Sequence, residues 1–228
     1  AQRKQFLDGD WDASEDSAFP EFRKTAHVVE PFEIPRSWYK FRAADWGYSS
    51  PACVLWFAID YNNNIWIYRE LYTKKVTADY FARQVVSMEQ GEHIHYGVLD
   101  SSTWARRGDV GPSIAETMIQ NGCRWRPSDR SPKSRISGKL EIHKRLRVID
   151  KEPGIRVFKT CRNLIRTLGS LPTDDKNPED VDTNAEDHAY DALRYGCMSR
   201  PTHPKYAERF RTSFTDDSYK MADNKFGY

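Results

Sequence analysis

The sequence lacks the features of a membrane, secreted or repeat protein. No apolar run approaches the roughly 20 residues that span a bilayer, and the mean hydropathy is −0.79, which argues against a membrane role. The first residues do not follow the charged, apolar and small-residue order of a secretory signal. No internal repeat or low-complexity tract interrupts the chain. These absences favour a globular protein in a reducing cytoplasm.

Cysteine is scarce, and its spacing argues against disulfides and zinc. The four cysteines are Cys53, Cys123, Cys161 and Cys197. They form no CxxC pair and no Cys/His pairing at zinc-finger intervals. We therefore expect four buried free thiols.

The charge is distributed unevenly along the 228 residues, a length that suits one substantial core. The formal net charge is only +2. Basic residues nevertheless concentrate between positions 124 and 147, and acidic residues crowd positions 174–187. The first region suits phosphate groups, and the second suits a metal ion.

The hydrophobic pattern predicts a mixed α/β fold. Aromatic and β-branched residues fill 39–45, 52–60 and 65–72, so these three strands should form an antiparallel meander. The three asparagines at 62–64 form the turn between the last two. Further strands are expected at 95–100, 123–125 and 155–158, and helices at 77–90, 113–121, 138–148, 161–168 and 184–198. Ser113 with Glu116 forms a capping box, and Asn184 is expected to cap the last helix.

Three aspartates stand at the ends of these elements. Asp45 ends the strand expected at 39–45, Asp100 ends the strand expected at 95–100, and Asp187 opens the last helical segment. Carboxylates on two strand ends and one helix can converge and hold paired divalent cations, which promote phosphodiester hydrolysis. The sequence therefore indicates a candidate nuclease.

Each acid also has a structural interpretation. Asp45 and Asp100 can each bond within a turn or loop, and Asp187 can complete a capping box with Asn184. Asp191 lies one turn after Asp187 on the same helical face, where a neighbouring arginine can form a solvated salt bridge. His188 fits a metal ligand, a phosphate contact or an exposed polar residue.

Taken together, Asp45, Asp100 and the run Asp187-His-Ala-Tyr-Asp-Ala-Leu-Arg-Tyr195 resemble the C-terminal nuclease domain of tailed-bacteriophage terminase large subunits. The resemblance covers most of the chain. It implies an RNase H-like fold, with a central mixed sheet flanked by helices. It also implies a metal-dependent endonuclease that cuts concatemeric viral double-stranded DNA during genome packaging, in the host cytoplasm at the procapsid.

The resemblance also implies residue roles. Asp45, Asp100 and Asp187 become catalytic metal ligands, and Asp191 and His188 become supporting or alternate ligands. Two Mg²⁺ or Mn²⁺ ions suit such oxygen ligands. Phosphate contacts to DNA are expected from the cations of the basic region and of the loop after Asp100, namely Arg106, Arg107, Arg130, Lys133, Arg135 and Lys139.

The expected organisation is a connector at residues 1–37, a nuclease domain at 38–199 and a tail at 200–228. No GxxxxGK[ST] phosphate loop is present, so the resemblance places ATP-driven translocation in an ATPase domain outside this sequence. The portal and the small terminase subunit are further partners that it implies. Two alternatives remain: another RNase H-like nuclease of junction-resolvase or transposase type, and a non-catalytic module for DNA binding or motor docking.

Overall fold

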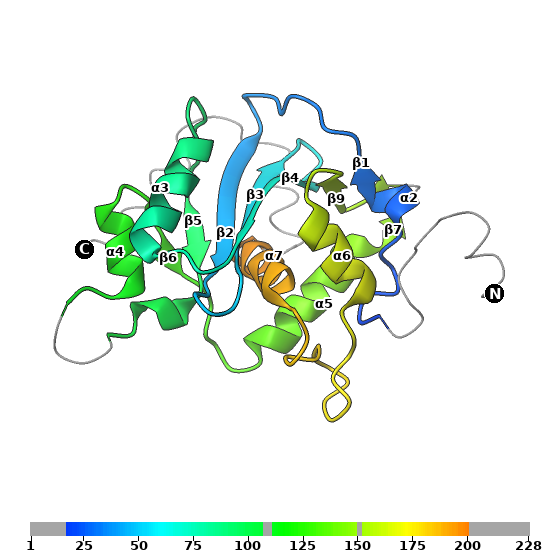
Figure 1. Cartoon of the computed structure of the whole chain (residues 1–228). Helices are drawn as coiled ribbons and strands as arrows, with labels where there is room; N and C mark the ends of the chain where they lie inside the picture. Colours follow the sequence, from blue (N-terminus) through cyan, green and yellow to red (C-terminus); the bar gives the residue numbers. More distant parts are fainter. Residues whose placement is uncertain (1–16, 107–110, 150–151, 201–228) are drawn as a thin grey trace.

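The computed structural model describes residues 17–106, 111–149 and 152–200. Its centre is a seven-stranded sheet in the order β1-β9-β4-β3-β2-β5-β6, and a separate pair of short strands forms β7-β8 (Figure 1). The strand bounds are β1 Val28–Val29, β2 Tyr39–Asp45, β3 Ala52–Ile59, β4 Ile65–Thr73, β5 Gly97–Leu99, β6 Arg126–Pro127, β7 Val148–Ile149, β8 Glu152–Pro153 and β9 Ile155–Phe158. The helices are α2 Lys24–His27, α3 Ala78–Met88, η1 Ser101–Trp104, α4 Ile114–Gln120, α5 Ser134–Leu146, α6 Arg162–Ser170 and α7 His188–Ser199.

The predicted meander is confirmed, within a sheet of mixed direction. Strands β2, β3 and β4 pair antiparallel in sequence order, and Asn63 takes the left-handed φ of 63° that the turn requires. The short strand β1 comes before them, however, and pairs parallel with β9. The first three strands of the chain are therefore not all antiparallel. Strand β2 also pairs parallel with β5, which completes the expected central mixed sheet.

Helices cover both faces of the sheet, which explains why every residue of β3 is buried. Phe57 of β3 lies against Gly196 of α7. Arg42 of β2 points to the opposite face, where it pairs with Glu89 at the end of α3. Helices α5 and α6 both contact α7, so α7 is enclosed at the centre of one layer (Figure 1).

The segment before residue 38 is part of this folded unit from residue 17 onward. Phe19 and Phe22 are completely buried in the core, and Ala18 donates a backbone hydrogen bond to Leu171. The remainder of the expected connector, residues 1–16, and residues 201–228 of the expected tail lie outside the described residues. Isolated aromatics in a polar context gave no periodic signal, which is why the sequence did not place these side chains in the core.

Several local expectations hold and others shift. The capping box of Ser113 and Glu116 is present at the start of α4, and all four cysteines are buried and free. Helix α5 begins at Ser134 rather than at residue 138, after Lys133 in a left-handed conformation.

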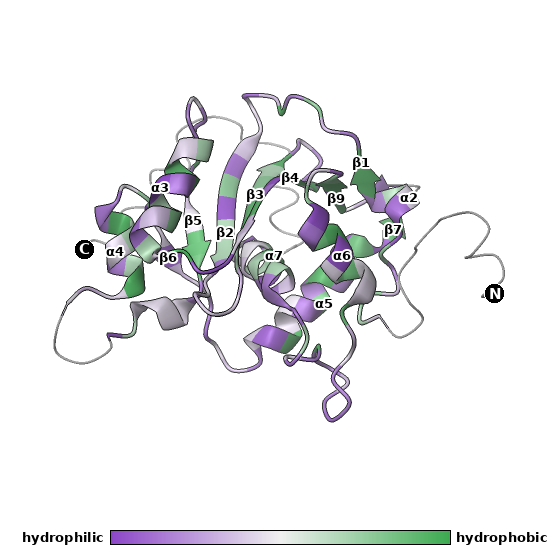
Figure 2. Cartoon of the chain, in the orientation of Figure 1, coloured by the Kyte–Doolittle hydropathy of each residue, from purple (hydrophilic) through white to green (hydrophobic). Residues whose placement is uncertain are grey.

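Figure 2 shows hydrophilic bands on β2 within an otherwise hydrophobic sheet centre. Lys40 and Arg42 of this strand are buried. No helix among the described residues is long and apolar enough to cross a membrane.

Candidate acidic site at the end of the sheet

The sheet brings Asp45 and Asp100 to the same edge. Strands β2 and β5 are parallel neighbours, with Ala44 level with Leu99, so Asp45 and Asp100 each follow this pair by one residue. The Asp100 amide donates to the Ala44 carbonyl at 3.1 Å, which holds the two strand ends together. The N-terminus of α7 lies beside them, since the Asp45 carboxylate contacts His188, the first residue of that helix. The carboxylates that the sequence singled out therefore converge.

Asp45 is a buried carboxylate in an unfavourable electrostatic environment. Only 8% of the residue is exposed, and its Oδ2 lies 2.9 Å from His188 Nδ1. Burial, reinforced by the negative charges of Asp191 and Asp100, raises the pKa of Asp45 to about 7, even though the His188 hydrogen bond acts in the opposite direction. The same hydrogen bond raises the pKa of His188. Folding thus brings together negative charge that a cation would stabilise.

Asp187 occupies the N-cap position of α7, but its side chain makes no capping hydrogen bond. Burial and the neighbouring charge of Asp191 raise its pKa to about 6, and Arg135 partly opposes that shift. The predicted cap at Asn184 is wrong, because α7 begins four residues later. Asn184 instead donates through its backbone and its side chain to Asp182, which forms a local turn.

Asp191 lies one turn into α7 and is also buried, at 8% exposure. Its Oδ1 accepts a hydrogen bond from Arg194 Nε at 2.9 Å and lies 2.8 Å from Arg194 Nη2. Arg194 is itself only 4% exposed. The solvated salt bridge that the sequence allowed is therefore a buried pair, and Asp191 is the acid most strongly engaged with arginine.

Asp100 is half-buried, and its carboxylate bonds its own loop. One oxygen accepts from the Ser102 amide at 3.1 Å and the other from the Ser102 hydroxyl. The loop interpretation of Asp100 is therefore realised. The negative charge of Asp100 also acts on Asp45, whose pKa it helps to raise.

Two residues that were predicted to contact DNA turn towards the protein. Lys139 is 6% exposed, and its Nζ donates to the carbonyls of Pro178 and Asp180 at 3.1 and 2.9 Å. Arg135 directs its guanidinium to Asp180 as well as to the two acids of α7. The charge of Lys139 is thus used inside the fold, and Asp180 is a contact that the sequence did not reveal. No local signal reveals it, because its partner Arg135 is 45 positions away.

The other predicted DNA contacts are distributed differently. Arg130 and Lys133 are exposed in the loop before α5. Arg106 is exposed and pairs with Glu116 at 2.8 Å. Arg107 lies outside the described residues.

The donor chemistry of the site fits a hard divalent cation. Carboxylate oxygens are the preferred ligands of such ions. Burial, together with the negative charge of Asp191, raises the pKa of both Asp45 and Asp187, so a nearby cation would favour their ionised forms. Among the described residues, no group of three His, Cys, Asp or Glu side chains is already arranged to hold a metal.

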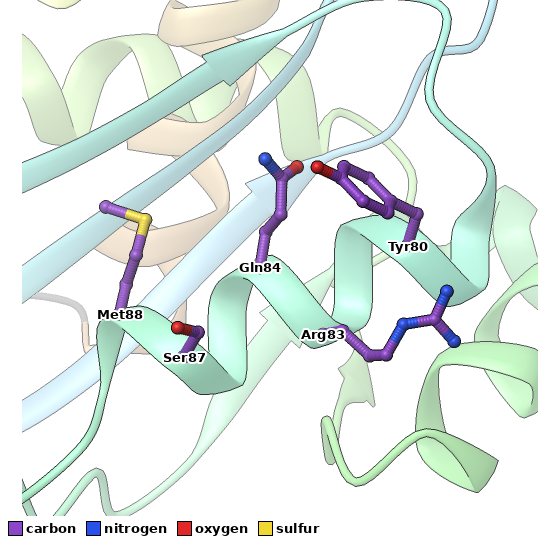
Figure 3. A pocket seen from close by; sticks show the side chains of 5 residues that line it. All are labelled: Tyr80, Arg83, Gln84, Ser87 and Met88. Carbon is purple, nitrogen blue, oxygen red and sulfur yellow. The ribbon is translucent and has the colours of Figure 1, made fainter.

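A hollow elsewhere on the surface does not belong to this site. It follows helix α3 and is lined by Tyr80, Arg83, Gln84, Ser87 and Met88 (Figure 3). None of these residues contributes a carboxylate.

Comparison with solved structures shows that the fold is that of phage large terminase nuclease domains. The P22 large terminase nuclease domain aligns with a TM-score of 0.67 at 18% identity, over 82% of this chain and 93% of that chain. The ADP-bound large terminase of a thermophilic bacteriophage aligns with a TM-score of 0.66 at 16% identity, over 87% of this chain and 50% of that chain. The large terminase nuclease of thermophilic phage G20c, in a structure with bound zinc, aligns with a TM-score of 0.53 at 14% identity, over 81% of this chain and 99% of that chain. No protein-family model and no curated protein matches the sequence. The resemblance expected from the sequence is thus confirmed in the fold, which is RNase H-like.

Proposed function

We propose that this chain is a metal-dependent endonuclease that cuts concatemeric viral double-stranded DNA during genome packaging. The observation that carries the proposal is the convergence of Asp45 and Asp100 at one sheet edge beside the acids of α7. The terminase nuclease fold supports it. The chain spans about half of the ADP-bound large terminase, so ATP-driven translocation belongs, in this proposal, to an ATPase domain elsewhere in the same subunit.

The proposed catalytic carboxylates are Asp45, Asp100 and Asp187, with Asp191 as supporting ligand. When bound, two Mg²⁺ or Mn²⁺ ions would polarise the phosphodiester, activate water and stabilise the leaving oxygen. His188 orients the Asp45 carboxylate through its hydrogen bond. Arg194 fixes the side chain of Asp191. The protein thereby holds one acid on each of β2 and α7 in a defined direction before substrate arrives.

DNA is held in this proposal through its phosphates. Arg130 and Lys133 are exposed cations on the loop that leads into α5, and α5 also carries Arg135, which contacts the acids. Such contacts offset the repulsion between the acidic site and the DNA backbone and carry little sequence information. In the cell, the site would work at the viral procapsid in the host cytoplasm, together with the portal and the small terminase subunit.

Plasmid cleavage tests the proposal most directly. Purified protein should nick or linearise plasmid DNA in the presence of Mg²⁺ or Mn²⁺. Addition of EDTA should stop this cleavage. Asp45→Asn and Asp100→Asn should each abolish cleavage, because each removes a carboxylate charge from the converging set. Asp175→Asn is the matched control, since Asp175 is exposed in the acidic loop, residues 171–187, which joins α6 to α7.

Circular dichroism and thermal melts would show that each variant folds. Cleavage retained in both Asp45→Asn and Asp100→Asn would contradict the assignment. Cleavage of four-way junctions in preference to plasmid or linear duplex would instead favour a junction-resolvase type of nuclease. DNA binding without cleavage in any divalent cation would favour a non-catalytic module.

A further inference from the structure

Arg135 places a positive charge within the acidic site itself. Its Nε lies 2.9 Å from Asp180 Oδ2, its Nη1 lies 3.4 Å from Asp191 Oδ2, and its Nη2 lies 3.7 Å from Asp187 Oδ2. A guanidinium stays protonated at every physiological pH. One fixed cation therefore faces two carboxylates of α7 that are proposed to serve the nuclease.

The contacts of Arg135 are unequal in strength. The bond to Asp180 has the length of a strong charge-assisted hydrogen bond, whereas the contacts to Asp191 and Asp187 are longer than the usual 2.7–2.9 Å or so. Nη2 is buried and finds no hydrogen-bond acceptor within the described part of the chain. Asp180 thus anchors the arginine, and the two acids of α7 hold it loosely.

The anchor is itself secured. Asp180 lies on the acidic loop, which Lys139 ties to α5 through the carbonyls of Pro178 and Asp180. Helix α5 carries both Lys139 and Arg135. The guanidinium can therefore turn away from Asp187 and Asp191 without releasing its strongest contact.

We propose that Arg135 is an internal counter-cation for Asp187 and Asp191, and that a divalent cation binding to these two acids competes with its guanidinium. The inference rests on the proposed nuclease function. Its physical basis is that a guanidinium and a divalent cation cannot both approach the same carboxylates closely without repelling each other. Because such coupling is reciprocal, the arginine weakens metal binding as much as the metal weakens the arginine's contacts. Arg135 would thus keep the site electrically balanced before the metal arrives.

Calorimetric titration with Mn²⁺, without DNA, tests the competition. Arg135→Gln should bind Mn²⁺ about tenfold more tightly than wild type, within the roughly 5–150-fold range of ordinary coupling between sites. Arg135→Lys keeps the charge and should remain close to wild type. Arg147→Gln is the matched control, because Arg147 is exposed at the far end of α5, and it should leave the Mn²⁺ affinity unchanged.

Thermal melts separate competition from a purely structural salt bridge. Competition predicts that Arg135→Gln lowers Tm without metal, because the carboxylates of Asp187 and Asp191 lose a positively charged neighbour. It also predicts that saturating Mn²⁺ restores most of this loss of Tm. An equal loss of Tm with and without Mn²⁺ would assign Arg135 a structural role only. In wild-type protein, Mg²⁺ should shift the NMR signal of the Arg135 Nε–H group, so this readout remains if Arg135→Gln does not fold.

The outcomes distinguish this inference from the proposed function. Wild-type protein that binds Mn²⁺, combined with an Arg135→Gln variant that binds no more tightly, would overturn the competition and leave the nuclease proposal standing. An Arg135→Lys variant that binds as tightly as Arg135→Gln would show that charge is not the cause. Absence of Mn²⁺ and Mg²⁺ binding by both wild type and Arg135→Gln would overturn both proposals.

Discussion

Lys139 shows that a basic residue in a basic helix need not face the substrate. Its ammonium lies inside the fold and satisfies two backbone carbonyls of the acidic loop. Lys133, six positions earlier, is exposed. Composition identifies the basic segment, but only the packing of α5 against the acidic loop determines which charges remain available to a ligand.

Substitution of Lys139 should therefore affect stability rather than DNA affinity. Lys139→Met keeps most of the apolar stem but leaves the carbonyls of Pro178 and Asp180 without their donor. We expect a loss of about 1–3 kcal/mol in the free energy of unfolding, measured by urea denaturation. Lys144→Met, at an exposed position of the same helix, should change it by less than about 0.5 kcal/mol. Equal effects of the two substitutions would contradict the buried role of Lys139.

Glu92 should give the protein an acid-sensitive stability that does not depend on the candidate site. Burial alone would raise its pKa, but hydrogen bonds from Arg69 and Tyr68, together with the positive charges of Arg69 and Lys40, outweigh burial and lower the pKa below the usual 4.5. A carboxyl with a depressed pKa stabilises the fold above its unfolded pKa and loses that contribution as the pH falls through its folded value. The stabilising contribution of Glu92 should therefore be lost as the pH drops below about 4.5.

Urea denaturation at several pH values between neutral and acid would measure this. Glu92→Gln should be less stable than wild type at neutral pH, and the difference should narrow in acid. Glu33→Gln, at an exposed position, is the control and should parallel wild type. A difference for Glu92→Gln that stays constant with pH would show that the ionised form is not what stabilises the fold.

The residues of the candidate site were predictable to different degrees. Asp45 and Asp100 each follow a run of apolar residues, so the sequence reveals the strand end and the acid together. The pairing of Asp187 and Asp191 with Arg135 depends on contacts across 52 and 56 positions of the sequence. No periodicity encodes such a contact. The contacts of Asp187 and Asp191 with Arg135 therefore could not be predicted from the sequence.

At the scale of elements, α7 is limited by close packing on the sheet. A Cβ at Gly196 would lie 2.3 Å from the ring of Phe57, so this position of the helix admits no side chain. At Gly169 in α6, by contrast, a Cβ would meet no atom within 4 Å. Gly169 and Gly196 therefore differ in whether they tolerate alanine.

Alanine substitution at these two glycines should change the free energy of unfolding in opposite directions. Gly196→Ala should destabilise the protein by about 1–3 kcal/mol, because overpacking displaces α7 from β3 despite the higher helix propensity of alanine. Gly169→Ala should be neutral or stabilise by up to about 1 kcal/mol. Urea denaturation of both variants provides the comparison. Stabilisation by Gly196→Ala would show that α7 does not pack as closely as described.

Element boundaries were predictable where the capping chemistry is local. Ser113 and Glu116 satisfy each other's backbone groups at the start of α4, and their spacing alone revealed this. The start of α7 was misplaced because Asn184 has a competing acceptor in Asp182, two residues earlier. A residue that can cap a helix or close a turn does not reveal its choice in isolation.

At the scale of the whole molecule, the mixed sheet was predictable from the strand pattern, whereas its outer part was not. Strand β1 has only two residues and is defined by pairing with β9, more than a hundred positions away. Its existence depends on long-range hydrogen bonds rather than on local propensity. The burial of Phe19 likewise depends on a partner far away in the sequence, because its ring lies 5.4 Å from the ring of Tyr190 in α7, measured between centroids.

The separation of exposed cations from buried ones gives a prediction for DNA binding. Arg130 and Lys133 precede α5, whose 13 residues separate them by about 20 Å from the other end of the helix. If this loop contacts phosphates, the double variant Arg130→Glu/Lys133→Glu should bind duplex DNA more weakly. The slope of the logarithm of the binding constant against the logarithm of the salt concentration is negative, and it should become less steep by about 0.9 for each phosphate that the protein no longer neutralises.

Fluorescence anisotropy with duplex DNA of unrelated sequences, over a range of salt concentrations, measures both quantities. The double variant Lys144→Glu/Arg147→Glu makes the same change in net charge at exposed positions near the far end of α5. A general effect of net charge would weaken binding equally in the two double variants, whereas a localised phosphate-binding surface predicts weaker binding only in the first. Because phosphate contacts carry no base information, the weakening should be the same for every DNA sequence. Unchanged affinity of the first variant at low salt would place the DNA on another face of the molecule.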